Sequence, residues 1–165
     1  MRNYKNPLTY ALYLLELRDR SIGEIKDKMR RKKFSDGEIT KTIDFLLSKN
    51  FLDDEKFAER FAKEKQELQH WGWYRIQAEL RRKFISNDII EHLIKLRSEN
   101  NSMLSNELNG DESDEMRTAR EAADLWRRKN PKCPKEKIYS RLGGFLSSRG
   151  FSYDLVKEIL NDFIK

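Results

Sequence analysis

Runs of consecutive lysine and arginine are the residues of this sequence whose type and spacing are best suited to bind a ligand. Two such runs lie 51 residues apart: Arg30, Arg31, Lys32 and Lys33, and then Arg81, Arg82 and Lys83. Fixed cations bind phosphates largely through counterion release, and this binding weakens steeply as salt is added. The carboxyl ends of helices also favour lysine and arginine, because the helix dipole is negative there. The sequence leaves both interpretations open: contact with an anionic polymer, or ordinary helix ends.

Other reactive side chains are too few or too scattered to predict catalysis or metal binding. His70 and His92 belong to no metal-binding or catalytic spacing. Cys133 is the only cysteine, so no internal disulfide and no cysteine-rich zinc site can form. Gly143 and Gly144 lack the following lysine and hydroxyl residue of a phosphate-binding loop. We therefore expect neither an enzyme nor a bound cofactor.

Both basic runs lie in a pattern that occurs three times, at residues 25–43, 76–94 and 142–160. Each copy has two apolar residues four positions apart, a corner with at least one base, and then an apolar residue, a serine and two more apolar residues. The apolar spacing is that of one helix face, and the serine is a good helix N-cap. With only 7 glycines and 3 prolines, the chain is predicted to be all-α, with three three-helix repeats.

The corners between the second and third helices of these repeats are residues 30–34, 81–85 and 147–151, named below the first, second and third corner. Two capping boxes are predicted in the first repeat. Ser21 with Glu24 starts its second helix, and Ser35 with Glu38 starts its third helix. We also expect the acids Asp53, Asp54 and Glu55 to start a helix, where carboxylates meet free backbone amides.

The predicted domains are repeat 1 at 7–52, repeat 2 at 53–97 and repeat 3 at 116–165, with an acidic flexible linker at 98–115. The chain has a net charge of +6, yet residues 98–116 contain six acids and no lysine or arginine. The excess of bases therefore lies in the repeats. We predict that the third helix of repeat 2 ends near Leu96, where this polar segment begins. A fraying extension of that helix into the segment is the alternative.

An aromatic cluster precedes the second helix of repeat 2. Trp71, Trp73 and Tyr74 flank Gly72 and could stack on bases or anchor a protein partner. Aromatic residues near a helix start are also common in a hydrophobic core. We predict that Tyr74 is a core residue, and the sequence leaves both interpretations open for the two tryptophans.

No segment approaches the roughly 20 apolar residues that a membrane-spanning helix needs. The apolar run at residues 8–15 is followed by charged residues and by no small-residue cleavage site. We therefore expect a cytoplasmic protein with no membrane partner.

Several motifs along the chain form a recognisable order. They are Ala11-Leu12, Leu14-Leu15, Arg18-Asp19-Arg20-Ser21, Glu24-Ile25 and Met29; Phe51-Leu52-Asp53-Asp54 and Phe57-Ala58; Gly72, Arg75-Ile76 and Glu79-Leu80; and Arg149-Gly150-Phe151-Ser152-Tyr153. In this order they resemble the RecX family, the regulators of the RecA recombinase. The glycine that the family has in its corners is present as Gly150, while Lys33 and Phe84 stand at the equivalent positions of the first two repeats.

The resemblance implies an elongated, curved array of three tandem three-helix, helix-turn-helix-like repeats. It implies a monomer that binds the groove of the RecA–single-stranded DNA filament, restrains ATP hydrolysis and strand exchange, and so takes part in homologous recombination, DNA repair and the SOS response. Double-stranded DNA is a further candidate partner. The candidate filament- or nucleic-acid-binding residues are Arg18, Arg20, Arg30, Arg31, Lys32, Lys33, Arg75, Arg81, Arg82, Lys83 and Arg149. A DNA-binding helical-repeat protein without RecA specificity, and a protein-only scaffold, are the alternatives.

Overall fold

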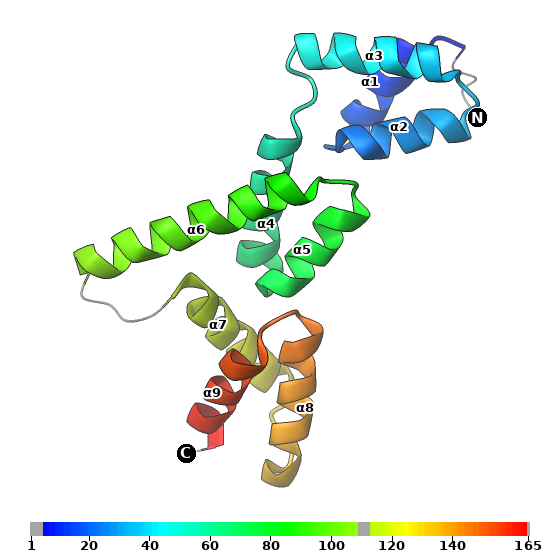
Figure 1. Ribbon diagram of the computed structural model, residues 1–165. Coiled ribbons are helices and arrows are strands. Elements are labelled where there is room, and N and C mark those ends of the chain that lie inside the picture. The colour runs from blue at the N-terminus through cyan, green and yellow to red at the C-terminus, as the bar shows by residue number, and fades with distance from the viewer. Residues whose placement is uncertain (1–4, 109–112, 165) are drawn as a thin grey trace. The chain divides into compact units, whose positions relative to one another are not determined.

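A computed structural model describes residues 5–108 and 113–164, which form nine α-helices and no β-strand. In chain order these are α1 (Pro7–Leu17), α2 (Ile22–Arg31), α3 (Asp36–Ser48), α4 (Asp54–Gln69), α5 (Trp73–Arg82), α6 (Asn87–Leu108), α7 (Asp114–Lys129), α8 (Lys135–Ser148) and α9 (Tyr153–Ile164) (Figure 1). The predicted all-α fold class is confirmed. None of these described helices has the length and apolar content needed to cross a membrane.

The chain divides into two compact units. The first comprises the described residues up to Arg60 together with Leu80–Ile90, and the second comprises Phe61–Glu79 together with the described residues from Glu91 onward. Helices α4, α5 and α6 therefore each contribute residues to both units.

In the first unit, α1, α2 and α3 pack against one another around a continuous core (Figure 1). Its buried members are Ala11, Leu14, Ile25, Met29, Ile39, Ile43, Leu46 and Leu52. Their spacing of three or four residues within each helix places them on one face. Both predicted capping boxes are confirmed, Ser21 with Glu24 at α2 and Ser35 with Glu38 at α3. Each serine cap contributes about 1 kcal/mol.

In the second unit, α7, α8 and α9 form another three-helix core. Its buried members are Ala119, Ala122, Ala123, Trp126, Ile138, Leu142, Leu146, Phe151, Val156, Ile159 and Leu160. The three alanines share one face of α7, where their small side chains let the neighbouring helices approach closely.

The three corners have the same backbone conformation, which explains the repeated sequence pattern. At each corner one residue has a left-handed conformation: Lys33 (φ 67°), Phe84 (φ 62°) and Gly150 (φ 83°). The next residue donates its backbone N–H to a carbonyl five residues earlier: Phe34 to Met29, Ile85 to Leu80 and Phe151 to Leu146. This is the Schellman motif, whose two ends carry apolar side chains that touch. The repeated spacing of apolar residues around each corner is therefore the signature of a helix stop.

Helix α6 is longer than predicted. It ends at Leu108 instead of near Leu96, because no glycine or proline interrupts residues 97–108. Part of the segment predicted as a flexible linker is therefore helical, and residues 109–112 of that segment lie outside the described residues. Helix α7 then starts with Ser113 as its N-cap.

Candidate nucleic-acid interface

The first corner presents four cations on the surface of the first unit. Arg30, Arg31, Lys32 and Lys33 are all exposed. Arg31 Nε lies 2.9 Å from Asp27 Oδ2, and Arg30 Nε lies 3.5 Å from Asp36 Oδ1. Ion pairs this exposed hold their partners weakly, so all four cations can turn to an external anion.

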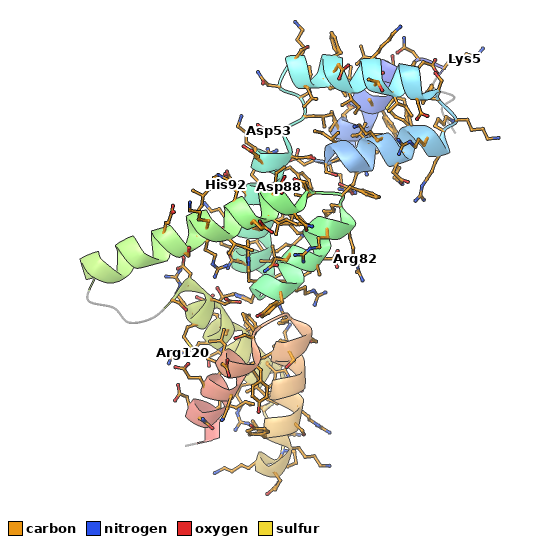
Figure 2. The ribbon with its side chains drawn as sticks, in the orientation of Figure 1. Lys5, Asp53, Arg82, Asp88, His92 and Arg120 are labelled. Atoms are coloured by element: carbon orange, nitrogen blue, oxygen red, sulfur yellow. The ribbon has the colours of Figure 1, made fainter. Side chains whose placement is uncertain are left out.

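The second corner combines exposed bases with one base that is held inside the unit. Arg82 is exposed at the end of α5 (Figure 2), and Arg81 is exposed with Nε donating to Asn87 Oδ1 at 3.2 Å. Lys83 differs, because its Nζ lies 3.4 Å from Glu24 Oε1 and 5.7 Å from the centre of the Phe57 ring. Its side chain is only 19% exposed.

The second corner holds the amino end of α2, and we call this contact the first junction. Ser21 Oγ donates to the backbone carbonyl of Lys83, and the Ile22 N–H donates to Asp54 Oδ1 at 2.8 Å. Gly23 allows the close approach, since a Cβ there would lie 2.2 Å from Phe84 Cβ. Helix α2 carries the first corner at its other end, so its 10 residues separate the two corners by about 15 Å, at 1.5 Å per residue.

The same contact recurs in the second unit, between the third corner and the amino end of α5, and we call it the second junction. The Gly72 N–H donates to the Arg149 carbonyl at 2.8 Å, and the Tyr74 N–H donates to the Gly150 carbonyl at 3.1 Å. Glu115 Oε1 accepts from the Trp73 N–H at 2.9 Å, as Asp54 does from Ile22. In both units, therefore, a helix start is capped by a carboxylate and by the following repeat's corner.

Two of the predicted site residues are part of the second junction. Arg149 donates to the backbone carbonyls of Gln69 and His70, and burial, together with the charge of Arg75, lowers the pKa of its guanidinium. Arg75 donates to the Ser148 carbonyl at 3.0 Å and lies 4.1 Å from the centre of the Trp71 ring. Both arginines are half-buried, so the structure gives them contacts within the chain that the sequence did not predict.

The arginines of the α1–α2 turn also have partners in the first unit. Arg18 lies 2.7 Å from Glu24 Oε1. Arg20 Nε donates to the Leu14 carbonyl at 3.1 Å, and burial, followed by the charge of Arg18, lowers the pKa of Arg20. The predicted residues that are exposed at the first and second corners are Arg30, Arg31, Lys32, Lys33, Arg81 and Arg82.

The aromatic cluster divides into packed and exposed rings. Trp71 is half-buried with Lys65 Nζ 5.6 Å from its ring centre, and Arg97 lies 5.1 Å from the ring centre of half-buried Trp73. Cations already cover these rings, which favours the packing interpretation of the two tryptophans. The prediction for Tyr74 is wrong: it is 65% exposed, because Ile76 and Leu80 occupy the buried face of α5.

The three acids lie at the start of α4, as predicted, and Asp53 caps this helix. Asp53 Oδ1 accepts from the Lys56 N–H at 3.0 Å, while Asp54 reaches α2 across the first junction. Burial raises the pKa of Asp54, and the hydrogen bond from Ile22 opposes this rise. Across the described residues, no group of three or more His, Cys, Asp or Glu side chains is placed to hold a metal ion.

Glu24 links the α1–α2 turn to the second corner, and its ionisation should be visible in stability. Burial acts to raise its pKa, but the hydrogen bond from Arg18 and the charge of Lys83 outweigh it and lower the pKa below the ordinary value of 4.5. A lowered folded-state pKa adds stability above the unfolded-state value, and this stability is lost as the pH falls through the folded-state pKa.

We therefore expect Glu24→Gln to be less stable than the wild type above pH 4.5, with a difference that shrinks at lower pH. Urea unfolding of both proteins at a series of pH values measures this difference. A difference that stays constant across the acid range would contradict the assignment.

Comparisons with known proteins give three consecutive matches along the chain. Residues 8–46, 53–93 and 113–160 match the first, second and third three-helix domains of RecX, respectively. The chain is 31% identical over 155 residues to a protein named "Regulatory protein RecX" from Clostridium botulinum (strain Eklund 17B / Type B), covering 93% of this chain and 66% of that one. It thus spans slightly less than two thirds of that relative.

A second relative is similar over nearly its whole length. "Regulatory protein RecX" from Trichlorobacter lovleyi is 26% identical over 151 residues, which cover 90% of each chain. Among solved structures, the crystal structure of RecX from Lactobacillus salivarius matches with a TM-score of 0.72 at 19% identity, covering 97% of this chain and 96% of that one. This structural match supports the fold.

Proposed function

Because the chain belongs to the RecX family of regulatory proteins, we propose that it binds the filament of RecA on single-stranded DNA and lowers the filament's ATP hydrolysis and strand exchange. It acts by binding, without catalysing a reaction. It works as a monomer in the cytoplasm, where RecA filaments form.

The observation that carries this proposal is the exposed first corner. In the other two repeats the equivalent corner is engaged with the start of a helix in the preceding repeat. The first corner presents four exposed cations, at residues 30–33. Arg81 and Arg82 lie at the second corner, which the length of α2 separates from the first corner by about 15 Å. Two groups of cations at this separation suit a target that offers repeated phosphates.

ATP turnover by RecA on single-stranded DNA tests the proposal. We expect a purified preparation of this protein to reduce the turnover of preformed filaments in proportion to its concentration, and to lose potency as salt is raised. The matched control is RecA with an equal amount of heat-unfolded protein. Unchanged turnover at saturating protein would reject the function, and increased turnover would reject inhibition as its direction.

The exposed bases also favour a second candidate, a DNA-binding protein without RecA specificity. Such a protein would bind naked DNA as tightly as it binds the filament, since phosphates alone would supply its affinity. A regulator of the filament would bind the filament more tightly than either RecA or DNA alone, because it contacts both. Comparing the three affinities at one salt concentration separates the two candidates.

A further inference from the structure

Phe84 is a large apolar residue in an unfavourable place. Its φ of 62° lies in the left-handed region, which is costly for L-residues and a true outlier for bulky ones. Its side chain is nevertheless 59% exposed. Glycine is the ordinary residue for this position of a Schellman motif, and the third corner has it as Gly150.

Packing at the first junction covers only part of Phe84. Its Cβ and the ring atoms Cγ and Cδ2 lie near Gly23, yet the side chain remains 59% exposed. A glycine at position 84 would relieve the backbone strain and expose less apolar surface. Strain that persists at a largely exposed residue motivates a functional hypothesis.

The electrostatic surroundings of Phe84 indicate what the ring binds. Arg81 and Arg82 are exposed in the last turn of α5, and the Phe84 N–H donates to the Arg81 carbonyl at 3.0 Å. The ring therefore stands in the same turn as two guanidinium groups. Proteins that bind single strands combine such parts, with aromatic rings stacking on bases and cations binding the phosphates.

The second junction also has an exposed aromatic ring, but this ring belongs to the helix start and not to the corner. Tyr74 occupies the position equivalent to Gly23, and Gly150 occupies the position equivalent to Phe84. Tyr74 is 65% exposed, and its backbone N–H donates to the Gly150 carbonyl of the third corner at 3.1 Å. The close approach uses Gly23 at the first junction and both Gly72 and Gly150 at the second, but it does not require an exposed aromatic residue at either junction.

We infer that Phe84 in the first unit and Tyr74 in the second are stacking sites for the unpaired bases of single-stranded nucleic acid, with the exposed Arg81 and Arg82 binding the phosphates beside Phe84. This deepens the proposed function, because the filament contains a single strand. Duplex DNA does not use these rings, since its bases are already stacked on one another.

Binding of a dye-labelled oligodeoxythymidine to the full chain, followed by fluorescence anisotropy without RecA, tests the inference. We expect Phe84→Gly to bind about 5- to 100-fold more weakly than the wild type, while its thermal midpoint is unchanged or higher because the left-handed strain is relieved. Tyr74→Ala should weaken binding over the same range. Equal affinity of wild type and both variants would overturn the inference.

The chain offers a matched control in Phe51, which is 57% exposed but is followed by Asp53 and Asp54 in place of arginines. Phe51→Gly should leave the affinity for the oligonucleotide unchanged. An equal loss in Phe51→Gly and Phe84→Gly would overturn the inference, because it would show a general effect of removing exposed rings.

Two further measurements distinguish stacking from other uses of the ring. The first is the variant Phe84→Trp, which should keep wild-type affinity for oligodeoxythymidine. The second is an abasic strand of equal length. It should bind the wild-type protein as weakly as oligodeoxythymidine binds Phe84→Gly. Equal binding of abasic and thymidine strands would contradict stacking. If Phe84→Gly kept full oligonucleotide affinity but no longer reduced RecA's ATP turnover, the ring would contact protein, which would overturn this inference and leave the proposed function standing.

Discussion

Replacing Gly150 with alanine is expected to lower the free energy of unfolding of the second unit by roughly 2–4 kcal/mol. The left-handed φ of 83° is unfavourable for alanine. The new Cβ would also lie 2.3 Å from Arg75 N and 2.5 Å from Arg75 Cβ. The third corner would have to move away from α5, which would weaken the hydrogen bonds that Gly72 and Tyr74 donate to it.

Gly144 provides the matched control, because it lies in the same region but has no structural need to be glycine. It is in the interior of α8, and a Cβ there would meet no atom within 4 Å. Gly144→Ala is therefore expected to raise stability by about 0.5–1 kcal/mol through helix propensity. Urea unfolding of both variants measures the two effects. Similar effects of the two substitutions would show that the second junction does not stabilise the protein.

Reversing the charge of the first corner is expected to have the largest effect on function. Changing Arg30, Arg31, Lys32 and Lys33 to glutamate should raise the protein concentration that halves RecA's ATP turnover on the order of 100-fold. The logarithm of potency should also fall less steeply with the logarithm of salt concentration, by about 0.7 for each single-strand phosphate that the corner no longer binds. All four side chains are exposed, so the fold does not need their charge. Turnover assays at several salt concentrations measure both quantities.

Two controls make this result interpretable. The same four residues changed to glutamine avoid placing negative charge at the carboxyl end of α2, where it would oppose the helix dipole, and they should show a smaller loss in the same direction. Lys83→Met should lower stability without changing the potency, because Lys83 faces Glu24 and Phe57. Full potency of the glutamate variant would remove the first corner from the interface.

Structural features that depend on residues within one or two helical turns, such as helix caps and corners, were predictable from the sequence. The capping serines Ser21 and Ser35 bond to residues three positions away, and the corners close hydrogen bonds over five residues. Local residue types are sufficient to determine such features. The start of α4 at the acids following Leu52 was predictable for the same reason.

Features decided by distant residues were not predictable in this way. Ser21 and Lys83 are 62 residues apart in sequence, and Arg149 and Gln69 are 80 apart. No local pattern shows which cations of a basic run will be held by such contacts. The exposure of Tyr74 has the same cause, since it depends on which face of α5 is buried. The signal that was available is the set of glycines at the junctions, Gly23, Gly72 and Gly150, where an added Cβ would collide with the contacting segment.

The binding of this protein to RecA filaments is the most direct test of the account. Filaments assembled on single-stranded DNA with a slowly hydrolysed ATP analogue can be sedimented at physiological salt, with naked DNA of the same length in a parallel sample. We predict that most of the protein sediments with the filaments and that little sediments with the DNA. Protein that stays in the supernatant with filaments, or that sediments equally with naked DNA, would contradict the claim that a RecA filament is its target.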